Sequence, residues 1–266
     1  MKKAVFFTLS LTMFAFIVLS LSFIFAGNAA TDDARFMELA SINRIYDLDT
    51  SLQNSFSKIL SFDSEMTYTA STTEAIFQQK IPFNFTRLNN SFNNLRNFAI
   101  YNDKNVQVGL LPNNVSLRVS QAGIVNWQNI SKNITEFMRT NSTPKSYSFI
   151  IDFFEINITS CSSSSASGNF LFSVAATGGN GTSCNQTLSI NPLQDASVEI
   201  SLGTKSLTVL FSNYSASVNA RDNKVALTSR INYADTGVKP KIFLESKINI
   251  TVPGLIAKKY GDLRIA

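Results

Sequence analysis

The sequence predicts a mainly β protein with a long N-terminal α-helix: a transmembrane helix plus amphipathic extension, followed by an antiparallel β-sandwich head. Three observations support this fold class. They are an uncharged apolar run from Ala4 to Ala26, a helical spacing of apolar residues from Asp32 to Phe62, and short alternating apolar runs after Met66. We expect three units: residues 1–30 as a cytoplasmic leader and transmembrane helix, 31–64 as the helical extension, and 65–266 as an extracytoplasmic β-rich domain.

The run from Ala4 to Ala26 is long enough to cross a lipid bilayer. As a helix it measures about 35 Å, whereas the hydrocarbon core is roughly 30 Å thick. Lys2 and Lys3 precede the run, Asp32 and Asp33 follow it, and basic flanks are retained in the cytoplasm. We therefore expect a single-pass protein of the cell membrane, with a cytoplasmic amino terminus and an extracytoplasmic body.

A cleaved secretory signal is the alternative interpretation of the same run. Small residues at Gly27, Ala29 and Ala30 resemble an A-x-A-like cleavage site. The apolar region of a signal usually covers only about 7–15 residues, which is shorter than this run. An anchor that keeps the apolar helix, either uncleaved or cut only in front of it, is therefore favoured over complete removal. Both interpretations export the body of the protein.

The segment from Asp32 to Phe62 has the pattern of an amphipathic helix without Pro or Gly. Its apolar residues recur every three or four positions, at Phe36, Leu39, Ile42, Ile45, Leu48, Leu52, Phe56 and Ile59. Either Thr31 or Asp32 caps a separate helix, or the transmembrane helix continues through both. The apolar stripe needs a covering surface, which is either the chain's own β domain or the same helix of another copy.

After Met66 the pattern becomes that of short β-strands separated by turns. Eight runs are predicted as strands: Asn105 to Leu111, Val115 to Ser120, Ser148 to Thr159, Phe170 to Thr177, Ala196 to Leu202, Ser206 to Tyr214, Lys224 to Tyr233 and Lys241 to Val252. Turn residues such as Gly203-Thr204-Lys205 and Asp222-Asn223 separate several of them, which favours an antiparallel sandwich. Two helical stretches, Leu88 to Phe98 and Trp127 to Met138, are expected to interrupt it.

Asn-x-Ser/Thr glycosylation motifs are frequent in the predicted head. The acceptor residues are Asn84, Asn89, Asn114, Asn129, Asn133, Asn141, Asn157, Asn180, Asn185, Asn213 and Asn249. In the run Ser148 to Thr159, the residues Ile150, Phe154, Ile156 and Ile158 share one face, which puts Asn157 on the opposite face. The same alternation places Asn249 on the solvent face, so we expect several acceptors to carry glycans. The alternative is that Asn simply suits exposed loops and strand faces.

The two cysteines, Cys161 and Cys184, flank turns beside predicted strands and have no metal-binding spacing. We expect a disulfide bond between them, because the body is predicted to reach an oxidising compartment. Closing a loop of this size stabilises a fold by about 3 kcal/mol. The alternative is a pair of unrelated buried thiols.

The residues of common catalytic and cofactor sites are missing from the sequence. There is no histidine, P-loop or GxGxxG motif, so we expect no enzyme activity, no cofactor and no metal site. Basic residues are scattered within a formal net charge of +5, which argues against nucleic-acid binding. The carboxylates that stand out are Asp32 with Asp33, Asp47 with Asp49, and Asp152. We expect Asp152 on an apolar strand face, with a basic partner. An exported hydrolase that uses carboxylates alone is the enzymatic alternative.

The layout resembles that of archaeal type IV pilins. Lys3-Ala4 followed by Val5 is similar to the prepilin cleavage pattern, in which a peptidase cuts after a small residue preceded by a charged one. Ala4 stands where that family usually has Gly, and Leu9 stands where bacterial pilins carry Glu. The resemblance covers only the first ~60 residues, and implies leader cleavage between Ala4 and Val5 and bundling of the apolar helices into a filament core.

The leading functional expectation is a membrane-anchored extracytoplasmic structural or adhesive surface protein that forms pilin-like filaments. Its expected partners are the lipid bilayer and other copies of itself, through the N-terminal helix. The alternative is a solitary single-pass membrane protein whose β domain binds a ligand or a partner protein.

Overall fold

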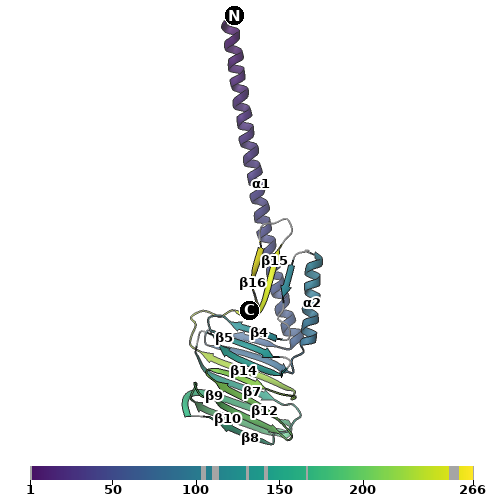
Figure 1. Ribbon diagram of the computed structural model, residues 1–266, viewed down its shortest axis with the longest axis vertical. Helices are drawn as coiled ribbons and strands as arrows, with labels where there is room; N and C mark the ends of the chain where they lie inside the picture. Colours follow the sequence, from purple (N-terminus) through teal and green to yellow (C-terminus); the bar gives the residue numbers. More distant parts are fainter. Residues whose placement is uncertain are drawn as a thin grey trace.

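A single long helix projects from a two-sheet head in the computed structural model of the protein (Figure 1). The structure describes residues 2–102, 106–109, 114–129, 132–140, 143–165, 167–251 and 258–265. Helix α1 (Lys2–Ser64) contains 63 residues, which corresponds to a rod of about 95 Å. It runs without a break through Asp32, so of the two alternatives the structure has the continuous helix and not a separate helix capped at Thr31 or Asp32.

Among the α1 residues whose side chains the structure describes, only the head-proximal ones are packed against the rest of the chain. Its buried residues are Ser41, Ile45, Asp49, Leu52, Phe56 and Leu60, and Leu48 and Ile59 are partly buried. Helix α2 (Phe85–Asn102) lies beside this part, where the rings of Phe56 and Phe92 are 4.8 Å apart. The chain's own head therefore covers the second half of the predicted stripe, while Phe36, Leu39 and Ile42 stay exposed.

The first sheet contains six strands and is mixed. In spatial order they are β1 (Thr67–Ala70), β2 (Glu74–Ile81), β14 (Val225–Tyr233), β7 (Pro144–Asp152), β9 (Ser167–Thr177) and β10 (Ser183–Ile190). The prediction of a purely antiparallel sandwich is wrong at one place, because β7 and β9 pair in parallel. The chain leaves this sheet after β7, forms β8 in the other sheet and returns as β9, and this crossover allows the parallel pairing.

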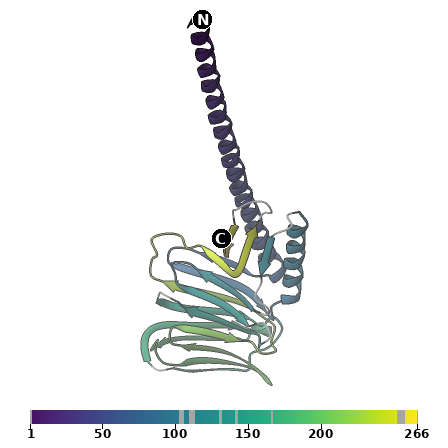
Figure 2. The ribbon, with the colours of Figure 1, turned by 45° about the horizontal axis from the view of Figure 1, so that its top comes forward.

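The second sheet contains ten strands, and all their pairings are antiparallel. Its order is β16 (Lys258–Arg264), β15 (Ile242–Thr251), β4 (Asn114–Val119), β5 (Ile124–Asn129), β6 (Ile134–Arg139), β13 (Ser215–Asn219), β12 (Lys205–Ser212), β11 (Ala196–Leu202) and β8 (Ser160–Ser164). Strand β3 (Val106–Gly109) also pairs with β15. Strands β15 and β16 lie beside α1, at the end of the head nearest to it (Figures 1 and 2).

Aromatic side chains fill the space between the two sheets. Tyr147 and Phe149 of β7 point inward with Phe172 of β9, and all three are fully buried. They meet Phe211 of β12 across the interface, where ring centroids are 5.6 Å apart for Phe172 and 6.0 Å for Tyr147. Many of the phenylalanines in the head are therefore core residues.

One predicted helix is correct and the other is wrong. The stretch Leu88 to Phe98 lies within α2, whereas Trp127 to Met138 forms the hairpin of β5 and β6. The inward positions of this hairpin include the polar residues Asn126, Gln128 and Thr135, so its two-residue alternation is not an alternation of apolar and polar residues. Gln79 of β2 compensates two of them: its amide donates to Thr135 Oγ1 at 2.6 Å, and its carbonyl accepts a hydrogen bond from Gln128.

The predicted faces of the run Ser148 to Thr159 are also wrong. Strand β7 ends at Asp152, and its inward residues include Phe149 and Ile151, whereas Ile150 is 50% exposed. Phe154 has a left-handed backbone with φ of 56° and is 52% exposed, so the chain turns there instead of continuing as a strand. Asp152 points to solvent and accepts a hydrogen bond from the Phe154 amide at 2.8 Å, which replaces the basic partner expected for it.

Candidate functional surfaces

The tip of α1 carries apolar side chains on all its sides, and nothing in the described chain covers them. We call Met13–Phe25 the tip segment. Ten of its large apolar residues are 46–77% exposed: Met13, Phe14, Phe16, Ile17, Val18, Leu19, Leu21, Phe23, Ile24 and Phe25. The hydroxyl groups of Ser20 and Ser22 donate to the carbonyl oxygens of Phe16 and Val18, at 2.8 and 2.9 Å. These polar groups are therefore satisfied inside the helix, as an apolar environment requires.

Among the residues that the structure describes, no helical stretch has the length and mean hydropathy of a membrane span. The transmembrane segment from Ala4 to Ala26 stays a prediction.

A second exposed apolar surface lies between the tip segment and the head. It consists of Phe36, Met37, Leu39, Ile42 and Tyr46, which are 49–72% exposed, and we call it the neck patch. Four of its members follow one another at intervals of three or four residues, so they form a stripe along one side of the helix. The stripe ends beside the first turns that pack on the head, at Ser41 and Ile45.

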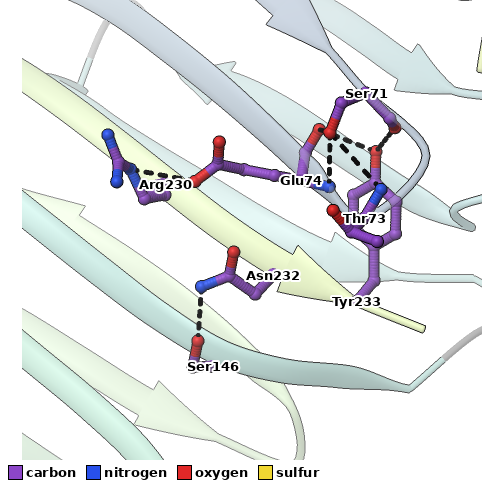
Figure 3. A network of polar contacts seen from close by, with 7 residues as sticks. All are labelled: Ser71, Thr73, Glu74, Ser146, Arg230, Asn232 and Tyr233. Atoms are coloured by element: carbon purple, nitrogen blue, oxygen red, sulfur yellow. Dashed lines mark hydrogen bonds and ion pairs between the residues drawn. The ribbon is translucent and has the colours of Figure 1, made fainter. Parts of the chain in front are cut away.

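A polar network clamps the hairpin of β1 and β2 to the end of β14 (Figure 3). The Tyr233 hydroxyl lies within hydrogen-bond distance of two carbonyl oxygens, 2.8 Å from Ser71 and 2.9 Å from Glu74. The Ser71 hydroxyl accepts hydrogen bonds from the amides of Thr73 and Glu74, which fixes the turn. Burial, followed by the nearby charge of Glu74, raises the pKa of Tyr233 to about 12. This phenol is a protonated donor at neutral pH and serves to hold the turn.

The same network extends across the outer face of the first sheet. The Arg230 Nε atom lies 3.0 Å from the Glu74 carboxylate, and the Asn232 amide donates to the Ser146 hydroxyl at 2.8 Å. Asn232 lies directly opposite both Ser146 and Glu74 in the register, so Arg230 reaches Glu74 diagonally across β14 and β2. The network therefore joins β2, β14 and β7 through satisfied pairs, an arrangement typical of structural stabilisation.

The carboxylates singled out from the sequence lie in different environments. Asp47 is exposed, whereas Asp49 is buried and accepts a hydrogen bond from the Gln53 amide at 2.6 Å. The side chains of Asp32 and Asp33 lie outside the described part. Among the described residues, no group of three His, Cys, Asp or Glu side chains is arranged to hold a metal ion.

The predicted disulfide bond between Cys161 and Cys184 is confirmed. Cys161 lies on β8, the last strand of the second sheet, and Cys184 lies on β10, the last strand of the first sheet. Their Cα atoms are 5.8 Å apart, within the usual range for a disulfide. The bond therefore ties the two sheets together at one edge of the sandwich, where each sheet has a free strand.

The glycosylation motifs fall into distinct environments. Asn84, Asn157, Asn180, Asn185 and Asn213 are exposed, whereas Asn89, Asn129 and Asn133 are half-buried. The side chains of Asn114, Asn141 and Asn249 lie outside the described part, as do those of Ala4 and Val5 at the predicted leader cleavage site. Glycosylation and leader cleavage both stay predictions.

Two shallow hollows on the outer face of the second sheet were not expected from the sequence. They share Leu210 and Ser212 of β12 and have volumes of about 340 and 240 Å³. Each hollow is lined by three serines on a wall that is more apolar than polar, with Asp195 beside one hollow and Glu136 beside the other. Apart from Asp195, which directly precedes β11, their residues come from β6, β8, β11, β12 and β13, which only the sheet order brings together.

Comparison with protein-family models, curated proteins and solved structures finds no match to this chain.

Proposed function

We propose that the protein is a membrane-anchored, extracytoplasmic structural or adhesive surface protein, and that α1 joins its copies into a pilin-like filament. The observation that carries this proposal is the pair of exposed apolar surfaces on α1. A bilayer accounts for the tip segment but not for the neck patch, as the following steps explain.

The tip segment supports the anchoring role. It lies inside the uncharged run from Ala4 to Ala26, whose length as a helix matches a hydrocarbon core of roughly 30 Å. Its large side chains are exposed on all sides of the helix, and its serine hydroxyls are satisfied internally. Lys2 and Lys3, which directly precede the apolar run, favour a cytoplasmic amino terminus, and this orientation puts the head outside the cell.

The neck patch supports assembly through helix–helix contacts. Phe36 follows Ala26 by about 15 Å along the helix axis, and Asp32, Asp33 and Arg35 lie between them. Such a charged segment belongs in water or in the headgroup region, so lipid chains do not cover the neck patch. An α1 helix of a second copy, packed alongside, would bury both surfaces at about 25 cal/mol for each Å² of apolar area.

The head supports an extracytoplasmic location. Its disulfide bond ties the two sheets together, and such bonds persist in oxidising compartments and are rare in the cytosol. Charged residues make up only 15% of the chain, and Ser, Thr and Asn supply much of the exposed polar surface of both sheets. This composition suits a structural or adhesive surface.

The two hollows favour a second candidate function, in which a solitary single-pass protein binds a ligand through its head. Serine hydroxyls surround Leu210 there, and the carboxylates of Asp195 and Glu136 lie at the two sides. Such a surface suits a neutral or cationic ligand that presents both apolar and polar groups. In this case the helix serves only as an anchor.

The charge-introducing variant Phe14→Asp distinguishes the two functions. In a filament, the carboxylate would be buried unpaired among helices, which costs several kcal/mol, so electron microscopy should show that filaments are lost. In a solitary anchor, one lipid-facing charge costs only about 3 kcal/mol, and the protein should still reach the surface. Phe154→Asp is the matched control, because Phe154 is an exposed phenylalanine of the head.

Amino-terminal sequencing of the surface protein provides the second measurement. A terminus at Val5 supports the filament function, because cleavage after Ala4 would keep the whole apolar helix. A terminus at Met1 or Lys2 would contradict the pilin-like function and leave the solitary anchor. A terminus near Ala30 or Thr31 would replace both with a secreted protein.

A further inference from the structure

We propose that the head carries a cluster of N-linked glycans at the end farthest from the tip of α1, on Asn157, Asn180 and Asn185, and that Asn133 stays unmodified. This inference rests on the proposed export of the head, because the modifying enzyme and its sugar donor act outside the cytosol. It goes beyond the proposed function by selecting, among the glycosylation motifs, three that lie together and that the folded protein can use, and one that it cannot use.

The chemistry sets the requirements for each acceptor. The Asn side-chain nitrogen forms a bond to C1 of the sugar, while the bond from C1 to the phosphate oxygen of a lipid-linked sugar donor breaks. The nitrogen loses one proton, and the lipid phosphate leaves with the bonding electron pair. The folded protein must therefore expose the side-chain nitrogen and leave room for a bulky product.

The three selected asparagines meet these requirements. Asn157 lies in the segment between β7 and β8, Asn180 lies in the short 3-10 turn Gly179–Gly181, and Asn185 lies on β10. All three are exposed, and within the described chain no hydrogen bond engages their side-chain nitrogens. Asn185 follows the buried Cys184, so the alternation of β10 directs it to the outer face of the first sheet.

These three acceptors belong to one region of the head. A Cβ atom added to Gly179 would lie 2.9 Å from Asn157 Oδ1, so the Asn157 segment rests on the turn that carries Asn180. The Gly179 amide also donates to the Ile156 carbonyl at 2.9 Å. Strands β8, β9 and β10 form the end of the head farthest from the tip of α1 (Figure 1). Glycans at these positions would cover the free edge of the sandwich, next to the disulfide bond.

Asn133 is the contrasting case. It is half-buried, and its side-chain nitrogen donates to the Arg221 carbonyl oxygen at 2.7 Å. Its own carbonyl oxygen accepts a hydrogen bond from the Ala220 amide at 3.2 Å. Both contacts hold Asn133 against the segment that joins β13 to β14, so a sugar on this nitrogen has to displace that segment.

Site-by-site mass spectrometry of the surface-exposed full-length protein tests the proposal. We expect glycopeptides at Asn157, Asn180 and Asn185 and an unmodified peptide at Asn133. The triple variant Asn157→Gln, Asn180→Gly, Asn185→Gln should lose the mass of all three glycans. Glycine is used at position 180 because φ there is 54°. Asn169→Gln on β9 is the control, since Asn169 is exposed but has no glycosylation motif, and its glycan mass should equal that of the parent.

Two further measurements separate this proposal from the proposed function. Surface biotinylation reports export, and non-reducing peptide mapping of Cys161 with Cys184 reports the folded head. A surface-exposed, disulfide-bonded protein without glycans at the three positions would overturn the glycan cluster alone. A glycan on Asn133 in that protein would overturn the selection rule. A protein that stays in the cytosol with free thiols would overturn the proposed function and the cluster together.

Discussion

At the scale of single residues, the structure relies on buried polar groups that connect distant parts of the chain. Tyr233 bonds to the turn at Ser71, which lies 162 positions earlier, and Gln79 joins β2 to both β5 and β6. Such bonds contribute about 1 kcal/mol each, but an unsatisfied buried partner costs more. They therefore specify which strands meet and in which register.

Tyr233 gives a prediction about stability and pH. Tyr233→Phe removes the hydroxyl that holds the Ser71 turn, so the free energy of unfolding at pH 7 should fall by about 1 kcal/mol in urea denaturation. The fold also favours the protonated phenol, since its pKa is about 12 in the protein and 10.0 in the unfolded chain. Below pH 10 this contribution is complete, and it is lost as the pH rises towards 12.

The variant should therefore lose less stability than the parent between pH 10 and 12. Burial also raises the pKa of Tyr147 and of Tyr68, so part of the alkaline loss remains in the variant. Tyr101→Phe is the control, because Tyr101 is 86% exposed. Its replacement should change neither the free energy of unfolding at pH 7 nor the loss of that free energy between pH 10 and 12. An equal loss of unfolding free energy between pH 10 and 12 in the parent and in Tyr233→Phe would contradict this prediction.

At the scale of elements, periodicity reveals the strands whose two faces differ in polarity. The run Ala196 to Leu202 coincides with β11, where apolar residues alternate without exception, and Lys224 to Tyr233 differs from β14 by one residue, where only Ser229 interrupts the apolar inward positions. Strands β8 and β13 escaped prediction because serine dominates them. Hairpin β5–β6 was assigned as a helix because polar residues occupy its inward positions.

The candidate surfaces also differ in how far the sequence alone predicts them. The disulfide and the apolar tip of α1 could be predicted, since cysteines and uncharged runs are visible locally. The neck patch could not be separated from the rest of the stripe, because only the fold shows that the head covers Ile45 but not Phe36. The Tyr233 clamp and the two hollows depend on strand order, which local patterns do not contain.

The two halves of the helical stripe should respond differently to truncation of a phenylalanine. Phe56 is fully buried against Phe92, so Phe56→Ala should lower the free energy of unfolding of the head by about 3–5 kcal/mol. Phe36 is 72% exposed, so Phe36→Ala should leave that free energy within about 0.5 kcal/mol but weaken association between copies. Thermal unfolding and analytical ultracentrifugation measure the two effects. A large stability loss in Phe36→Ala would mean that the neck patch packs on its own head.

At the scale of the whole molecule, α1 combines two roles along one rod. From Ser41 to Leu60 it is a core element of the head, packed on α2 and close to β15 and β16. Before Ser41 its exposed apolar side chains make no contribution to the core of the head. Folding and assembly are therefore assigned to consecutive parts of the same helix, and a truncation near this boundary separates them.

A chain that begins at Ala40 should fold and remain monomeric. It keeps all the α1 residues that are buried in the described part of the chain, so its thermal midpoint in circular dichroism should match that of the head in the full-length protein. It lacks the tip segment and most of the neck patch, so it should sediment as a monomer where detergent-extracted full-length protein associates.

A chain that begins at Glu65 is the control: it also loses Phe56 and Leu60, two fully buried side chains, and should unfold at a lower temperature or fail to fold. If the chain from Ala40 still associates, the faces of the sheets and not α1 hold the copies together, and the role given to the helix would have to be abandoned.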